Sequence, residues 1–211
     1  MTQAPGWVVV LNGAPRSGKS SIAAAIQAAF EQPWMNLGVD VHARHVTPHR
    51  YQPGIGLRPG ADRPEVAALV PTLYAALYES IAAHSRLGLN VVADVGHHGA
   101  NPAGFDVLRD CARRLRGLPA LLVGVLCPID VIMQRRNAGQ DGREGQYLIG
   151  SVGLPIPAPI QLWQDQVHVP GLYDLELDTS ILSPAQCADV IGRRLRAPEP
   201  PTAFGRLAAG A

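Results

Sequence analysis

Short apolar runs alternate along the chain with longer segments in which apolar residues recur at helical spacing. The runs are bounded by Gly, Pro, Asn or Asp, and they contain the β-branched and aliphatic residues that are typical of buried parallel strands. The chain therefore predicts five strands, over residues 7–12, 33–40, 90–94, 120–126 and 173–177.

The segments between these runs have apolar residues three or four positions apart, which is the period of an amphipathic helix. We expect Pro71 to kink the longest of them, Gly88 to end it, and Ser183 to cap the last helix, with Pro184 in its first position. The predicted helices cover residues 20–30, 66–87, 105–115, 128–137 and 184–195. Strands that alternate with helices predict an α/β fold with a five-stranded parallel sheet covered on both faces.

Three segments have no such period. Residues 41–63 and 139–159 are rich in Gly and Pro and are expected to be loops, and the second would form a small lid at about 136–150. The segment from Ala197 onward lacks a packing pattern, so we expect residues 197–211 to be a disordered tail. Residues 1–196 then form a single domain.

Charge and cysteine content limit the classes of function. The net charge is +1, so the chain lacks the basic excess of a nucleic-acid-binding protein. No apolar stretch reaches the roughly 20 residues of a membrane span. Cys111, Cys127 and Cys187 form no metal-binding or disulfide pattern, so we expect a reducing, cytoplasmic location. The sequence leaves homo-oligomer formation open.

One position departs from the composition of the rest. The chain has 18 basic residues, of which Lys19 is the single lysine. It lies in the pattern Gly13-x-x-x-x-Gly18-Lys19-Ser20, which follows a predicted strand and opens a predicted helix. This is the phosphate-binding loop pattern, known as the P-loop or Walker A motif. An ammonium group is compact enough to fit inside the curled loop, whereas the planar guanidinium of arginine is not.

The chemistry of the motif assigns a role to each part of the loop. Backbone N–H groups and the positive end of the following helix would hold the phosphates of ATP, Lys19 would contact the β- and γ-phosphates, and the hydroxyl of Ser20 would bind Mg²⁺. The expected nucleotide-binding residues of the loop are Gly13, Ala14, Pro15, Arg16, Ser17, Gly18, Lys19, Ser20 and Ser21.

Two aspartates end predicted strands at the edge where ligands of parallel sheets collect. Asp40 closes the second strand and is a candidate base for an attacking hydroxyl; the alternative is a cap or turn aspartate. Asp94 closes the third strand and is a candidate Mg²⁺-side carboxylate, although such short patterns also occur by chance. The P-loop favours the functional interpretation of Asp94.

Three arginines lie at the start of the Gly-rich segment. Arg135, Arg136 and Arg143 would bring cations to a lid that closes over the phosphates and stabilises the charge of the transition state. The alternative is a solvated helix end, which is the commoner meaning of paired arginines. We expect one of the three to be functional, and the sequence pattern leaves open which.

The histidines give a weaker signal. His42, His45 and His49 have a spacing that fits one helix face, but the proline before His49 argues against a helix there, and no Cys or carboxylate nearby completes a metal site. His97 and His98 follow the third strand and are either substrate contacts or polar loop residues.

The sequence resembles the chloramphenicol phosphotransferase family, whose fold is related to nucleotide and shikimate kinases. The resemblance rests on five ordered blocks, of which "EQPWMNLGVD" is the distinctive one. The blocks are "VVVLNGAPRSGKSSI", "EQPWMNLGVD", "GLNVVADV", "LLVGVLC" and "VHVPGLYDLELDTS". The resemblance implies a P-loop kinase fold and transfer of the γ-phosphoryl group of ATP to a hydroxyl of an antibiotic. It also implies that Asp40 is the base and that Arg135 belongs to the lid.

Two segments depart from the family pattern and concern the acceptor. Residues 41–63 are rich in His, Arg and Pro, and residues 144–166 are longer than the family's connection between the lid and the last strand. The expected partner is thus a small-molecule hydroxyl acceptor, with chloramphenicol as the leading example. A metabolite or nucleotide kinase and a regulatory nucleotide-binding protein remain alternatives. Four residues would suit an anionic acceptor or form a solvated loop: Arg44, His45, His49 and Arg50.

Overall fold

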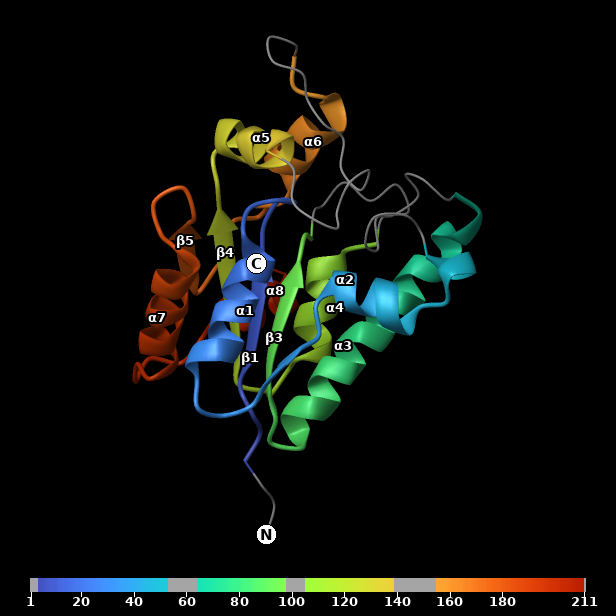
Figure 1. Cartoon of the computed structure of the whole chain (residues 1–211). Coiled ribbons are helices and arrows are strands. Elements are labelled where there is room, and N and C mark those ends of the chain that lie inside the picture. The colour runs from blue at the N-terminus through green and yellow to red at the C-terminus, as the bar shows by residue number, and fades with distance from the viewer. Residues whose placement is uncertain (1–3, 53–63, 98–104, 139–154, 211) are drawn as a thin grey trace.

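A computed structural model describes residues 4–52, 64–97, 105–138 and 155–210 of the chain. Its centre is a five-stranded sheet in which every pairing is parallel, in the order β2-β3-β1-β4-β5 (Figure 1). The predicted α/β class with a parallel sheet is confirmed. The strands are β1 (Val8–Asn12), β2 (Trp34–Asn36), β3 (Asn90–Val95), β4 (Ala120–Leu126) and β5 (Leu175–Asp178).

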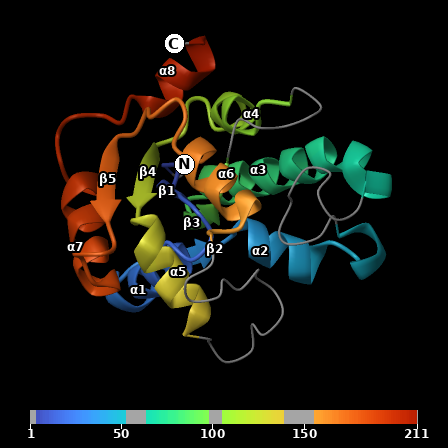
Figure 2. The same ribbon diagram turned by 90° about the horizontal axis from the view of Figure 1, so that it is seen from above.

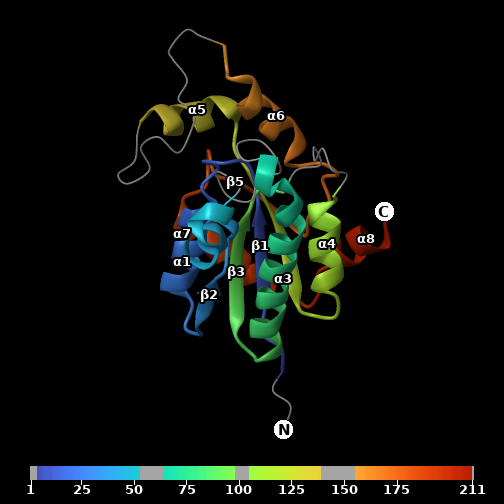
Figure 3. The ribbon, with the colours of Figure 1, turned by 90° about the vertical axis from the view of Figure 1, so that its right-hand side faces the viewer.

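Helices cover both faces of this sheet. α1 and α7 pack together on one face, and α3, α4 and α8 lie on the other (Figures 1 and 3). α5 and α6 lie above the carboxyl ends of the strands, as the view onto that edge shows (Figure 2). The helices are α1 (Lys19–Ala29), α2 (Val39–Val41), α3 (Val70–Arg86), α4 (Val107–Arg114), α5 (Ile129–Asn137), α6 (Ala158–Gln166), α7 (Pro184–Leu195) and α8 (Ala203–Ala209).

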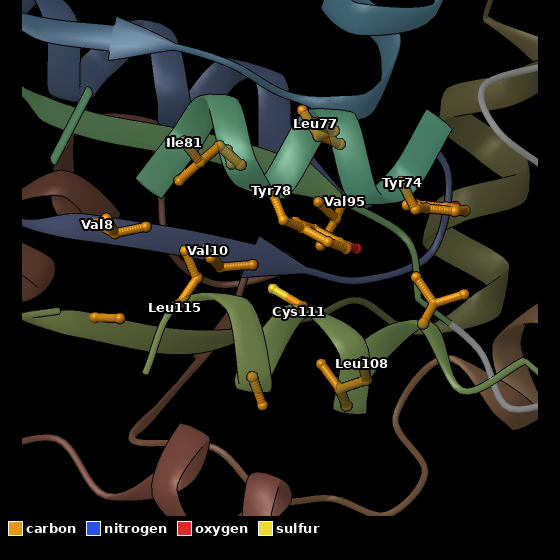
Figure 4. Close-up of a cluster of buried hydrophobic side chains, with 14 of the residues drawn as sticks. Val8, Val10, Tyr74, Leu77, Tyr78, Ile81, Val95, Leu108, Cys111 and Leu115 are labelled. Atoms are coloured by element: carbon orange, nitrogen blue, oxygen red, sulfur yellow. The ribbon is translucent and has the colours of Figure 1, made fainter. Parts of the chain in front are cut away.

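The central strand divides the core into two layers. Side chains of successive strand residues point to opposite faces of a sheet. Val8 and Val10 accordingly join the cluster under α3 and α4, whereas Val9 and Leu11 join the cluster under α1 and α7. The first cluster includes the fully buried Tyr78, which lies between β1, α3 and α4 (Figure 4). Burial on both faces explains the unbroken apolar run of this strand.

The stretch Glu65–Arg86 is long and apolar enough, by length and composition alone, to cross a membrane, so the expectation that no stretch reaches that length is wrong. In this fold it contains α3, whose side chains Tyr74, Leu77, Tyr78 and Ile81 are buried against the sheet and α4. We therefore interpret it as a core helix.

The second strand is shorter than predicted, which changes the position of Asp40. β2 ends at Asn36, and Asp40 lies in α2, so the prediction that Asp40 ends a strand is wrong. Gly38 is the N-cap of this short helix, and its N–H donates a hydrogen bond to the Asn36 side-chain oxygen at 3.2 Å. Asp40 nevertheless remains at the carboxyl edge of the sheet, since only three residues separate it from β2.

Part of the expected loop after Asp40 is helical. α2 continues into a π-helix, His42–Val46, in which Thr47 N–H donates to His42 O at 3.0 Å. Thr47 is extended (φ −84°, ψ 124°) because the residue before a proline disfavours the helical region. The prediction of a loop is wrong for residues 41–46 and for the short 3-10 helix His49–Tyr51, and Pro48 separates these two helices.

The long helix is divided differently from the prediction. A 3-10 helix, Pro64–Leu69, precedes α3, and Pro71 lies within the first two positions of α3. Pro71 has no N–H to donate, so it is tolerated in a first turn but not in a continuous helix. The break thus replaces the predicted kink. Gly88 follows α3 in the left-handed region (φ 82°), as expected for the end of a helix.

Two further α-helices were not predicted. α6 begins after Pro157 with Pro159 in its first two positions, so prolines that suggested a loop belong to a helix start. α8 lies in the segment predicted to be a disordered tail, and that prediction is wrong for residues 203–209. Its buried side chains, Ala203, Phe204 and Leu207, have helical spacing and pack into the core cluster beside α4.

The packing of α8 leads to a test. Phe204 is 7% exposed, so Phe204→Ala should lower the free energy of unfolding by about 3 kcal/mol through lost burial and a cavity. Arg206→Ala on the exposed side of the same helix should change it by less than about 0.5 kcal/mol. Urea unfolding measures both, and equal stability of the two variants would show that α8 is not docked.

Candidate active site

The loop between β1 and α1 is curled at the carboxyl edge of the sheet. Gly13 N–H donates to Val95 O of the neighbouring strand at 3.3 Å, and Ser17 N–H donates back to Ala14 O at 3.1 Å. Gly18 is the N-cap of α1 and has a left-handed backbone (φ 96°). The loop therefore ends with the first turn of α1 at Lys19, which is the geometry of a phosphate-binding loop.

Two features of the loop backbone restrict which residues can occupy it. A Cβ atom at Gly13 would overlap Val125 O and lie 2.8 Å from the Ser17 hydroxyl. Arg16 is the one non-glycine residue with a positive φ (74°) in the described part of the chain. Such a conformation costs about 1–3 kcal/mol and is concentrated at functional sites.

The ammonium group of Lys19 lies inside the curl. Its Nζ donates to Gly13 O at 2.8 Å and to Ala14 O at 2.9 Å. Burial lowers the pKa of Lys19 to about 8, against the opposing charges of Asp94 and, to a smaller extent, Asp40. Both predicted carboxylates therefore lie close enough to Lys19 for their charges to act on it.

Asp94 is bound directly to the loop helix. The hydroxyl of Ser20 donates to Asp94 Oδ2 at 2.6 Å, so the two predicted metal ligands are adjacent. The other carboxylate oxygen, Oδ1, occupies the space that a Cβ atom at position 38 would take. This space is available only because residue 38 is a glycine. Asp94 is thus held between the start of α1 and the start of α2.

Asp40 is half-buried in α2, two residues after Gly38. It also lies near Tyr74 of α3: burial, and then the charge of Asp40, raises the pKa of Tyr74 well above its usual value. The side chain therefore lies close enough to Lys19 of the P-loop and to Tyr74 of α3 for its charge to act on both. This position is compatible with a base beside the P-loop, and the role of Asp40 as that base stays a prediction.

Arg135 of α5 lies beside the loop and is hydrogen-bonded to Thr179 and to the loop backbone. Its guanidinium donates to Thr179 O at 2.6 Å, to Thr179 Oγ1 at 3.1 Å and to Arg16 O at 3.4 Å. Thr179 in turn donates to Ser17 O at 2.7 Å. Arg135 and Thr179 therefore connect α5, the end of β5 and the loop backbone, so a direct role of Arg135 over the phosphates stays a prediction.

The remaining predicted residues are distributed as follows. Ala14 and Ser17 are buried, Pro15 is half-buried, and Ser21 is exposed on α1, away from the buried face of that helix. Arg136 is buried and has interactions within the protein. Arg143 and most of the predicted lid lie outside the described residues, as does His98.

The predicted histidines separate into two groups. His42 is buried, and burial lowers its pKa, whereas His45 and His49 are exposed. His97 is buried at the end of β3, where its Nε2 lies 2.6 Å from the Tyr78 hydroxyl and its N–H donates to Asn12 Oδ1 at 2.7 Å. His97 is therefore a buried residue that links Tyr78 of α3 to Asn12 of β1, next to the site.

Several residues at this edge were missed. Trp163 of α6 lies next to Gly96, where an added Cβ atom would be 3.4 Å from its ring. It also packs in one cluster with Ala14 of the loop, so α6 covers the site. Thr179 directly follows β5, and Asn12 ends β1 with a side chain that is completely buried. The strand-end rule that selected Asp94 would have found both. The position of α6 had no signal in the sequence, because it comes from tertiary packing.

Comparison with known proteins agrees with this geometry. The family model of chloramphenicol phosphotransferase-like proteins matches residues 6–196. A comparison with curated proteins finds no significant match.

Three solved structures share the fold at low sequence identity. The APS kinase of Mycobacterium tuberculosis, in complex with AMPPNP and APS, has a TM-score of 0.62 at 15% identity over 92% of this chain and 99% of that chain. The tunicamycin resistance protein of Deinococcus radiodurans has a TM-score of 0.60 at 16% identity over 94% and 99%. The shikimate kinase of Acinetobacter baumannii, in complex with shikimate, has a TM-score of 0.56 at 14% identity over 91% and 93%.

The contact between Gly38 and Asp94 leads to a prediction about the site's packing. Gly38→Ala should lower the free energy of unfolding by about 2 kcal/mol, because the added methyl group must displace the Asp94 carboxylate or the α2 backbone. Gly205→Ala is the matched control: a Cβ there meets nothing within 4 Å on α8, so stability should rise by roughly 0.5 kcal/mol. Thermal unfolding compares the two, and a Gly38→Ala variant as stable as the Gly205→Ala variant would contradict the contact.

Proposed function

The chain belongs to the chloramphenicol phosphotransferase-like family, and we propose that it transfers the γ-phosphoryl group of ATP to a hydroxyl group of a small molecule. Family and fold make the chain a phosphotransferase of the kinase class. ATP as the donor, Mg²⁺ as the metal and the kind of acceptor are parts of the proposal, and each is supported by residues of the site.

The observation that carries the proposal is the pair of carboxylates around Lys19. Asp94 and Asp40 both act on the pKa of this ammonium group, and Lys19 lies inside the P-loop curl. One buried cation with two acids of different surroundings is what phosphoryl transfer needs at a P-loop: charge for the phosphates, a metal-side acid and a base.

Asp40 has the surroundings of the base. It is half-buried on α2, whereas Asp94 already accepts the hydrogen bond of Ser20. In the proposed reaction the acceptor oxygen bonds to the γ-phosphorus, the bond to the β–γ bridging oxygen breaks, and ADP leaves. The proton of the acceptor hydroxyl goes to Asp40.

The residues present fit Mg²⁺. Ser20 Oγ and Asp94 Oδ2 are two oxygen donors 2.6 Å apart, and Mg²⁺ is usually held by one or two such protein oxygens together with phosphates and water. Among the described residues, no group of three or more His, Cys, Asp or Glu gathers as a cage for another metal. When bound, Mg²⁺ would neutralise charge on the β- and γ-phosphates; Ser20 and Asp94 would hold it.

We further propose that the acceptor is a hydroxylated antibiotic and that the protein acts in the cytoplasm. The family name directs the choice to chloramphenicol, and one structural neighbour is described as a tunicamycin resistance protein. The three cysteines are free and buried, as suits a reducing compartment. The experiment is incubation with Mg-ATP and a panel of hydroxylated antibiotics and metabolites, with mass spectrometry for the gain of one phosphate.

Asp40→Asn should retain nucleotide binding and lose transfer to the acceptor by about 100-fold or more, because the amide cannot take the proton. Mass spectrometry measures product, and calorimetry with Mg-AMPPNP measures binding. Asp189→Asn, on the exposed side of α7, is the matched control and should behave as the unmodified protein. Normal turnover of Asp40→Asn would refute its assignment as the base.

The lowered pKa of Lys19 predicts a pH dependence of nucleotide binding. Only the protonated amine attracts phosphate, so affinity for Mg-AMPPNP should be full below pH 8 and should fall above it, by up to about tenfold per pH unit. Lys19→Arg is the control: it should bind more weakly but keep its charge and lose this pH dependence. An affinity of the unmodified protein that stays constant through this range would contradict the predicted pKa.

A further inference from the structure

Three polar side chains at the sheet edge form a hydrogen-bonded chain that the proposed reaction does not use. Asn12 Nδ2 donates to the Tyr173 hydroxyl at 3.1 Å, and this hydroxyl lies 2.8 Å from His168 Nδ1. Asn12 Nδ2 also donates to Val167 O at 2.8 Å. The chain begins at the residue before Gly13 and ends on an imidazole, so it connects the P-loop to a group with proton chemistry.

The sheet fixes this chain rigidly. Asn12 is completely buried and also receives the N–H of His97 at its Oδ1. Its register partner on β4 is Gly124, where a Cβ would lie 2.7–3.0 Å from three atoms of the Tyr173 ring. The ring therefore lies flush on Gly124 while its hydroxyl reaches the next strand, and a side chain at position 124 would move it.

The geometry of the hydrogen bonds favours one tautomer of His168. The Tyr173 hydroxyl has one hydrogen and two acceptors nearby: His168 Nδ1 at 2.8 Å and Val167 O at 3.4 Å. Val167 O is the more distant acceptor and also accepts from Asn12, so we assign the hydroxyl hydrogen to the shorter contact with Nδ1. In the neutral ring the proton is then on Nε2, which makes no hydrogen bond within the part of the chain that the structure describes.

His168 lies beside the P-loop. The residue before it, Val167, is completely buried and packs in one cluster with Ala14 of the loop and Trp163 of α6. Burial, and then the positive charge of Lys19, lowers the pKa of His168 below its usual value. The ring is thus neutral at pH 7 and close to the ammonium group that the γ-phosphate would meet.

We propose that His168 binds the γ-phosphoryl group of the nucleotide through its Nε2–H, and that Tyr173 and Asn12 are the residues that position it. This inference rests on the proposed function, since it requires ATP at the P-loop. A neutral imidazole donates one directed hydrogen bond to a phosphoryl oxygen without adding a further charge beside Lys19. The position between α6 and β5 brings this donor from a segment that neither the P-loop nor the two carboxylates belong to.

The test compares two nucleotides that differ in the γ-phosphoryl group. By calorimetry, His168→Ala should weaken binding of Mg-AMPPNP by about tenfold, the effect of one hydrogen bond to a charged group, and leave binding of Mg-ADP unchanged. His168→Gln, which keeps an N–H donor, should recover part of the loss. Tyr173→Phe should show the same selectivity with a smaller loss, because the ring stays on Gly124 while the hydroxyl is removed.

His84→Ala is the matched histidine control: His84 lies in the last turn of α3, bonded to Ser80 O, and should change neither affinity. Equal losses for both nucleotides in His168→Ala, or no loss for either, would overturn the proposal, and the conservative variants answer the same question if His168→Ala does not fold. Failure of the unmodified protein to bind Mg-AMPPNP would instead refute the proposed function. Binding by the unmodified protein therefore distinguishes a failure of this inference from a failure of the proposed function.

Discussion

A single buried ammonium group holds the site together. Lys19 Nζ donates hydrogen bonds to two loop carbonyls, those of Gly13 and Ala14, and lies close to the carboxylates of Asp94 and Asp40. Without it, carbonyl oxygens and acids would face one another across a buried curl with no compensating charge, which is costly. The loop, the start of α1 and the strand ends can come together because one cation satisfies all of them.

The parallel sheet supplies the second constraint. Its strands all end at one edge, so residues far apart in the chain meet there: Asn12 at the end of β1, Asp94 near the end of β3 and Thr179 after β5. The hydrogen bonds between Ser20 and Asp94 and between Thr179 and Ser17 tie these strand ends to the P-loop. α6 closes the edge from above, with Trp163 next to the loop. The catalytic proposal therefore depends on topology as much as on the motif.

The parts of the fold that the sequence predicted are those with local causes. β4 coincides with its apolar run, and Ser183 forms the expected cap with Gln186 completing a capping box. The P-loop was predictable because its spacing encodes the backbone curl. By contrast, Asp40 was placed at a strand end because nothing in "GVD" separates a strand from a helix start. Whether Asp40 ends a strand or lies in a helix depends on the close approach of Gly38 to Asp94, which is a contact between residues 56 positions apart.

The helices α6 and α8 were also missed because tertiary packing stabilises them. Prolines and short length hide these helices in the sequence, and they are stabilised by packing on the site and on α4.

The solitary lysine has a practical consequence for chemistry on this protein. An amine with a pKa of about 8 is partly unprotonated at neutral pH, and apart from the amino terminus the chain offers acylating reagents no other primary amine. A reagent small enough to enter the curl would therefore label only Lys19 of the P-loop and the amino terminus, which a peptide map separates. The extent of labelling at Lys19 would report directly whether a phosphate-bearing compound shields that amine, without radioactivity and without knowing the acceptor.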